Sequence, residues 1–159
     1  MLLEERPGPH FDILLPRRLA EENRRPLGLF ALLNMDDVRG LRQPLDFALY
    51  ARACQVARQL RPQFEITLDE IARTVGSRQV NWATSRRPFR GACLRMARST
   101  GARMLIQAWC GGDHAGIDRL LVRVGLAGQP MDMRFRPQLA QRFFEVDPVG
   151  WRSFDPSSQ

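Results

Sequence analysis

Apolar and polar positions alternate along the first half of the chain in short blocks that predict both strands and helices. Apolar runs at residues 11–15 and 27–33 have the length of buried strands and are bounded by prolines or by turn-forming Asn and Asp residues. Residues 44–62 carry apolar side chains at near-helical spacing between two prolines, which predicts a helix. Alternation with a period of two over 64–69 then predicts a strand with one buried face.

The pattern over the next sixty residues is less regular. Residues 74–101 mix glycines with the turn-like segment Ser85-Arg86-Arg87-Pro88, and we expect one or two strands there. The apolar run 104–109 predicts another strand. Residues 113–125 predict a second helix, because Asp113 is placed to cap it and its apolar positions recur at near-helical spacing.

Two closing strands are expected at 135–144 and 149–154, so that β elements flank each predicted helix. This order predicts an α+β fold with two pseudo-symmetric lobes. Two small antiparallel sheets would surround a central cleft, with the helices on the outer faces. We expect residues 1–159 to form a single domain, with 155–159 as a frayed tail.

The composition adds a strong positive charge to this picture. The chain has 159 residues, of which 44% are hydrophobic, enough for one buried core. Its 24 basic residues are all arginine and outnumber 17 acidic residues, which gives a net charge of +7. Because the guanidinium group matches phosphate geometry, RNA or a nucleotide is an expected partner; a solvated basic surface is the alternative.

Three widely separated cysteines, Cys54, Cys93 and Cys110, lack the spacing of metal sites and are expected to be reduced thiols. No apolar run approaches the roughly 18 to 20 residues of a membrane span, and no leader-like segment is visible. We therefore expect a cytoplasmic protein without a membrane partner.

Four segments carry a resemblance to a known family. They are Phe11 to Pro16, Pro62 to Asp69, Phe135 to Ala140 and Pro148 to Phe154. In this order they resemble the 2′-5′ RNA ligase branch of the 2H phosphoesterases, over about residues 10–154. The resemblance implies the two-lobed fold and a site in the cleft between the lobes.

The family's chemistry depends on two His-x-Thr or His-x-Ser motifs, whose histidines act as general base and acid on a 2′,3′-cyclic phosphate without a metal or cofactor. Here the second motif falls on Gln138 and Ala140, and the first on Leu29 and Ala31, although a shift onto Gly28 is also open. Neither Gln nor Leu exchanges a proton near neutral pH, so the resemblance implies a pseudoenzyme without catalytic residues.

Two histidines remain that could replace the lost pair. His10 precedes the first predicted strand, and His114 lies in the first turn of the second predicted helix. Neither has a hydroxyl residue two positions later, and both flank the ends of elements. We interpret them as surface histidines.

If catalysis is lost, the arginines beside the second motif are the predicted phosphate or RNA ligands. Arg134, Arg136 and Gln138 share one face of the predicted strand, and Arg142 follows. The alternative is an edge strand whose arginines are solvated.

Two further groups of residues are interpreted as structural. The basic turn at Arg86, Arg87 and Arg90 is expected to be a solvated loop. The tryptophans are expected to pack in the core within strands rather than to stack on bases. They are Trp82, Trp109 and Trp151.

Three functions are consistent with these features. The first is an inactive 2H-like monomer that binds RNA ends or nucleotide phosphates in its cleft. The second is an active RNA 2′,3′-cyclic phosphodiesterase or 2′-5′ RNA ligase with a rearranged site. The third is a scaffold that kept only the fold and binds a protein partner.

Overall fold

The computed structural model describes residues 33–57, 59–110, 116–126 and 141–154. The chain divides into two units, 1–30 and 31–159, and all described residues belong to the second. The architecture below is that of this second unit.

The described part contains four helices, each beginning or ending where the sequence supplies a cap. Thr67 and Glu70 form a capping box at the start of one helix, which ends at Gly76 with a left-handed φ of 71°. Asn81 caps the longest helix by accepting a hydrogen bond from a backbone N–H, and Gly101, with φ 70°, ends it. The helices are α2 (Met35–Val38), α3 (Pro44–Val56), α4 (Leu68–Val75) and α5 (Trp82–Thr100).

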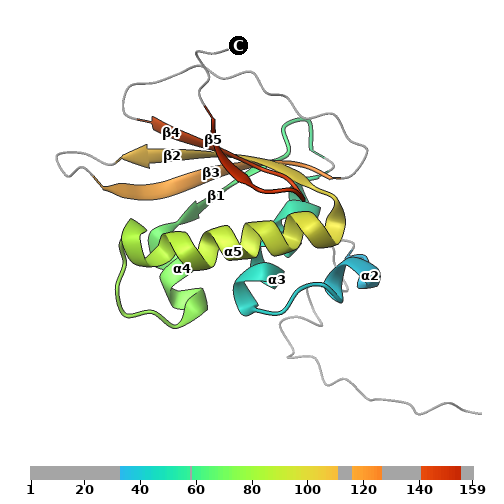
Figure 1. Ribbon diagram of the computed structural model, residues 1–159, viewed down its shortest axis with the longest axis horizontal. Coiled ribbons are helices and arrows are strands. Elements are labelled where there is room, and N and C mark those ends of the chain that lie inside the picture. The colour runs from blue at the N-terminus through green and yellow to red at the C-terminus, as the bar shows by residue number, and fades with distance from the viewer. Residues whose placement is uncertain (1–32, 58, 111–115, 127–140, 155–159) are drawn as a thin grey trace, which may run out of the picture. The chain divides into compact units, whose positions relative to one another are not determined.

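Five strands form one antiparallel sheet in the order β1-β3-β2-β4-β5 (Figure 1). Ile106 in the middle strand pairs with Val122 on one side and Phe144 on the other, which fixes the register of the sheet centre. The strands are β1 (Gln63–Thr67), β2 (Arg103–Cys110), β3 (Ile117–Gly125), β4 (Gln141–Val146) and β5 (Trp151–Phe154).

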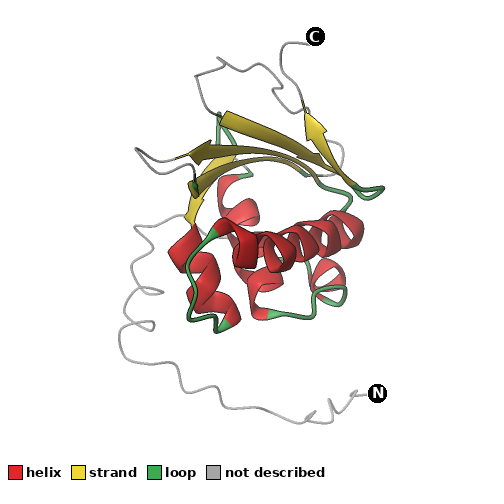
Figure 2. Ribbon diagram, turned by 60° about the vertical axis from the view of Figure 1, so that its left-hand side comes forward, coloured by secondary structure: helices red, strands yellow, loops and turns green. Residues whose placement is uncertain are grey.

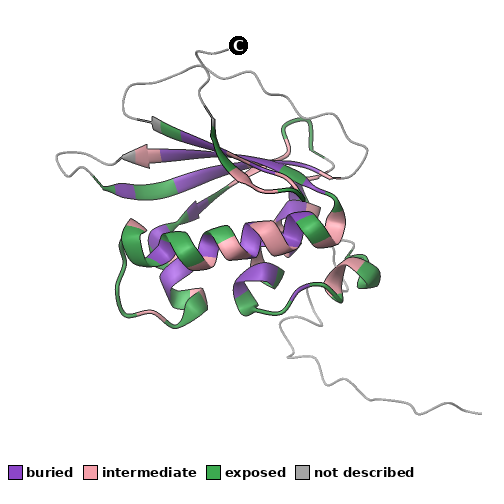
Figure 3. Cartoon of the chain, in the orientation of Figure 1, coloured by how far each residue is buried: buried purple, intermediate pink, exposed green. Residues whose placement is uncertain are grey.

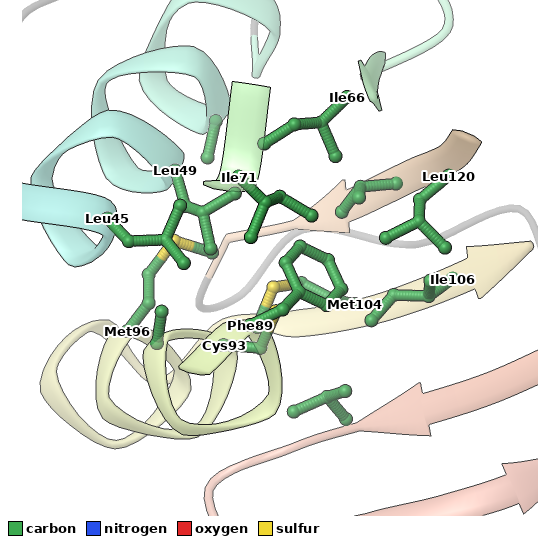
Figure 4. Packing of buried hydrophobic residues seen from close by; sticks show 14 of the residues in the cluster. Leu45, Leu49, Ile66, Ile71, Phe89, Cys93, Met96, Met104, Ile106 and Leu120 are labelled. Carbon is green, nitrogen blue, oxygen red and sulfur yellow. The ribbon is translucent and has the colours of Figure 1, made fainter. Parts of the chain in front are cut away.

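The helices α3, α4 and α5 cover one face of the sheet (Figure 2). Alternate residues of β2, including Met104 and Ile106, point toward them and meet Leu49, Ile71 and Phe89 in a continuous apolar core (Figure 4). The buried side of α5 therefore lies against the sheet and the other helices, while its other side is exposed (Figure 3).

The centre of the sheet is buried on its second face as well. Leu105, Leu121 and Phe143 are buried and alternate with the residues that face the helices. The middle strands therefore bury both of their faces.

The α+β class is confirmed, but the predicted two-lobed pseudo-symmetry with two small sheets is not. In the described part of the chain, strands from both halves of the sequence join one sheet. The helix predicted over 113–125 is wrong, because Ile117–Gly125 is strand β3. Its apolar residues fit helical spacing only because a central strand buries both faces and so loses its period of two.

The strands predicted within 74–101 are also wrong, since most of this segment is helix α5. Pro88 and the glycines suggested a turn, but Pro88 lies inside the helix. Arg86, Arg87 and Arg90 therefore stand on a helix and not on a loop. Trp82 begins that helix, whereas the other two tryptophans lie in strands as predicted.

The strands predicted at 11–15 and 27–33 lie outside the described residues, apart from Leu33, and the remaining predicted elements agree in type with the structure. The helix predicted over 44–62 is α3, which ends earlier, at Val56. The strand predicted over 64–69 is β1, but its last two residues already belong to α4. The run 104–109 is β2, and the closing pair corresponds to β4 and β5, with β4 beginning at Gln141.

Candidate functional site

Most residues that the sequence suggested for the site lie outside the described residues. These are His10, Leu29, Ala31, His114, Arg134, Arg136, Gln138 and Ala140. Of the predicted phosphate ligands, Arg142 is described. It is exposed on β4, where it pairs with Ala108 of β2.

A different group of arginines stands out on the structure. Arg86, Arg87 and Arg90 are exposed on the N-terminal half of α5, while Ser85 and Phe89 are buried on the other side of the same turns. Within the described part of the chain, these three arginine side chains form no hydrogen bond or ion pair. They present positive charge to solvent from a rigid helix.

The surrounding sequence contains no compensating acid. Between Glu70 and Asp113 there is no Asp or Glu, and eight arginines occur. Half of these have partners: Arg73 pairs with Asp69, Arg95 with Asp46, Arg103 with Glu145, and Arg98 donates to the carbonyl oxygen of Pro148. The other four are Arg78, Arg86, Arg87 and Arg90. Within this stretch, the arginines without partners among the described residues therefore lie at the start of α5 and in the turn before it.

Aromatic packing holds this end of α5 against the sheet. The rings of Trp82 and Phe144 stack with centroids 6.1 Å apart, and Phe89 meets Trp151 edge-on at 6.2 Å. Phe144 and Trp151 are themselves 5.0 Å apart. The N-terminal half of α5 is thus fixed to β4 and β5 by a cluster of large rings.

The other end of α5 is held by a buried ion pair. Arg95 donates to Asp46 of α3 through Nε and Nη2, both at 2.8 Å, and Asp46 is fully buried. Burial raises the pKa of the Asp46 carboxyl, but hydrogen bonds from Arg95 and from the backbone N–H groups of Arg42 and Gln43 together outweigh it, so the net pKa lies below the usual value. The pair fixes α5 relative to α3.

A second ion pair joins α3 to α4. Arg52 lies 2.7 Å from a carboxylate oxygen of Glu70 and also donates to the carbonyl oxygen of Glu65 in the middle of β1. The Arg52 guanidinium holds the pKa of Glu70 below its ordinary value, helped by the Thr67 backbone N–H. The helices α3 and α4 are thereby joined to each other, and α3 holds α5 through Asp46.

The hairpin of β2 and β3 brings further arginines to the same end of the unit. After Gly101 the chain turns back, so that β2 ends where α5 begins (Figure 1). There, the guanidinium of Arg119 lies 5.1 Å from the ring centre of Trp109. Arg142 lies two residues before Phe144, on the sheet face that Trp82 packs against. We call this group of six arginines the basic end: Arg78, Arg86, Arg87, Arg90, Arg119 and Arg142.

The described residues offer little for covalent or metal chemistry. No group of three or more His, Cys, Asp or Glu residues that could hold a metal ion occurs among them. Burial raises the pKa of the Cys93 thiol, and burial likewise raises that of Cys54. Thiolate nucleophiles are therefore disfavoured at both positions. The arrangement is suited to binding an anion.

The sequence interpretation missed the basic end because it assigned its central arginines to a solvated turn. Two features of the sequence indicated it. Residues 71–112 contain no Asp or Glu, and Asn81 is placed to cap a helix that would carry these arginines. Nothing local in the sequence could link Arg119 and Arg142 to α5.

Comparison with protein-family models, with curated proteins and with solved structures finds no match to this chain. Among the described residues, no helix has the length and apolar character needed to cross a membrane.

Proposed function

We propose that this protein binds double-stranded DNA by placing the N-terminal half of α5 in the major groove. The observation that carries the proposal is the order α3-β1-α4-α5-β2-β3, with β1 paired to β3, together with the arginines on the exposed side of α5. This order is that of a winged helix-turn-helix. In helix-turn-helix proteins the second helix of the motif enters the groove.

The dimensions of the elements support this placement. An α-helix with its side chains is about 10 to 12 Å wide, and the major groove of B-DNA is about 12 Å wide. The turn between α4 and α5 spans residues 76–81 and begins with the left-handed Gly76. Packing on α3 and on the aromatic cluster fixes α5, so that little conformational entropy is lost when DNA binds.

The charge distribution supports an anionic polymer as the partner. The arginines of the basic end come from the turn, the helix and two strands and are exposed. Arg142 lies on the sheet face that the helices cover, whereas Arg119 lies on the opposite face. Each phosphate neutralised by an arginine adds about −0.9 to the slope of log affinity against log salt on B-DNA. A protein that binds duplex DNA through several such contacts therefore loses affinity steeply as the salt concentration rises.

RNA is the competing ligand class. The major groove of A-form RNA is too deep and narrow for side chains to read, so a protruding helix favours duplex DNA over duplex RNA. The 2H-type proposal places RNA ends at Arg134, Arg136 and Gln138, which lie outside the described residues. Preferential binding of RNA ends is therefore one of the outcomes that the following experiment distinguishes.

The test is a fluorescence anisotropy titration at two salt concentrations. The probes are a labelled duplex DNA, a duplex RNA of the same sequence and a single-stranded RNA ending in a 2′,3′-cyclic phosphate. We expect tightest binding to the duplex DNA, with a steep salt dependence. Stronger binding to the cyclic-phosphate RNA would refute the proposal and favour the cleft site of the 2H resemblance.

A charge-matched pair of variants locates the surface. The triple variant R86A/R87A/R90A should make the salt slope less steep and weaken binding at least tenfold. The control R39A/R42A/R61A removes the same charge from exposed arginines outside the basic end and should change the affinity much less. Equal losses in the two variants would mean that net charge, not α5, binds the DNA.

A further inference from the structure

We propose that Arg87 and Arg90 read guanine bases, so that the preferred duplex carries two guanines on neighbouring base pairs. This inference rests on the proposed function and names the base that the helix selects. It follows from where each side chain stands on α5 and from what the helix lacks.

The outward direction of α5 is set by its buried residues. Ser85, Phe89 and Ala92 point toward the core. At about 100° per residue, Arg87 lies almost opposite them, Arg90 lies within about 60° of Arg87, and Arg86 lies toward the flank. Arg87 and Arg90 are therefore placed to reach the groove floor, and Arg86 to reach a phosphate.

Small residues surround Arg87 on the helix surface. Ala83 stands one turn before it and Gly91 one turn after it. A Cβ at Gly91 would lie 3.1 Å from Nη1 of Arg95, so a larger side chain there would have to displace this guanidinium. The surface is therefore low on the Ala83 side of Arg87, where α5 can approach base edges closely, whereas the Arg95 guanidinium covers Gly91.

The exposed side of α5 has no residue that makes paired hydrogen bonds to adenine or cytosine. Adenine is read mainly by Asn or Gln and cytosine by Asp or Glu, whereas Arg makes paired hydrogen bonds to O6 and N7 of guanine. The helix itself contains none of the first four types. Asn81, just before it, uses its side-chain oxygen to accept from the N–H of Thr84 at 2.9 Å.

The spacing of the two arginines sets the distance between their bases. Three residues of helix rise by about 4.5 Å, close to the rise of about 3.4 Å between base pairs. Arg87 and Arg90 therefore reach neighbouring base pairs and not the same one.

The experiment compares two duplexes that differ in one atom of each guanine. One contains GG steps in a mixed sequence, and the other has every guanine replaced by 7-deazaguanine, which removes the N7 acceptor but keeps the charge and pairing. We expect the wild-type protein to bind the first duplex at least about tenfold more tightly, because the second lacks the N7 acceptor that each arginine's paired contact requires.

Charge-preserving variants assign the effect to residues. R87K and R90K keep the positive charge but lose the fork geometry, so each should reduce the ratio between the two duplexes toward one while salt-dependent binding persists. The matched control R61K lies outside the basic end and should keep the wild-type ratio.

Two results would overturn the inference. Equal binding of both duplexes would refute guanine reading while leaving the DNA proposal intact. If R87K and R90K keep the wild-type ratio of affinities for the two duplexes, residues other than Arg87 and Arg90 contact the guanines. No binding to either duplex would refute the DNA proposal itself, which separates the two failures.

Discussion

Replacing Asp46 with asparagine tests the contact that holds α5 to α3. The carboxylate is fully buried and accepts four hydrogen bonds: two from Arg95 at 2.8 Å, and one each from the N–H groups of Arg42 at 2.9 Å and Gln43 at 3.1 Å. In the Asp46→Asn variant, the new side chain would present an NH2 group to some of these donors and leave them without an acceptor.

The expected loss follows from the burial of the pair. Removing one member of a buried ion pair costs about 3 to 5 kcal/mol. Because the Arg95 side chain is 29% exposed and can be partly solvated, we expect the lower end, about 3 kcal/mol of unfolding free energy. The control Asp36→Asn breaks a pair with Arg39 whose side chains are 79% and 82% exposed, and should cost less than about 1 kcal/mol.

The measurement is urea unfolding of both variants and the wild-type protein, with the midpoints compared at equal slope. The pH dependence gives a second readout. The folded pKa of Asp46 is depressed, so its stabilisation is present above the unfolded value of about 3.9 and is lost as the pH falls through the folded pKa. Acidification should therefore destabilise the wild-type protein more than D46N.

Two results would refute this reasoning. One is a loss in D46N no larger than that in D36N, which would mean that the buried pair adds no more than a surface pair. The other is a parallel acid profile for D46N and the wild-type protein, which would assign the acid sensitivity to other carboxylates.

Two further substitutions test the packing and the turn of the proposed DNA-binding unit. Phe89→Ala removes a fully buried ring that contacts Trp151, and it should lower the unfolding free energy by about 3 to 5 kcal/mol. The control Phe47→Ala changes a half-exposed ring and should cost much less. Equal urea midpoints for the two variants would contradict the packing of Phe89. Gly76→Ala places a Cβ in open space but keeps φ at 71°, so thermal unfolding should show a cost of about 1 kcal/mol from backbone strain, absent in the control Gly150→Ala.

Several elements of the fold could be predicted from the sequence because their signals are local. The helix from Pro44 has a proline at its first position and an acidic residue in its first turn. The alternation of Phe64, Glu65 and Ile66 marks a strand with one side against the core. In each case the hydrogen bonds or the buried face depend on residues close in the chain.

The errors arose where burial depends on distant segments. Ile117–Gly125 lies between β1 and β2 in the sheet and has buried residues on both of its faces, so its apolar pattern resembles that of a helix. Trp82–Thr100 is a helix despite Pro88, because its apolar side packs on the sheet and on α3. Propensity was overridden by tertiary contacts in this segment.

The sequence by itself determined the arginine-rich composition, the α+β class and the absence of acids around the arginines of α5. The tertiary structure decided that Arg87 and Arg90 face outward, because only packing of Phe89 and Cys93 against the core fixes the rotation of the helix. It also decided that Arg119 and Arg142 lie at the same end, since strand pairing joins residues that are more than twenty positions apart. Composition is a property of the chain alone, whereas a binding surface requires the long-range contacts that place its side chains together.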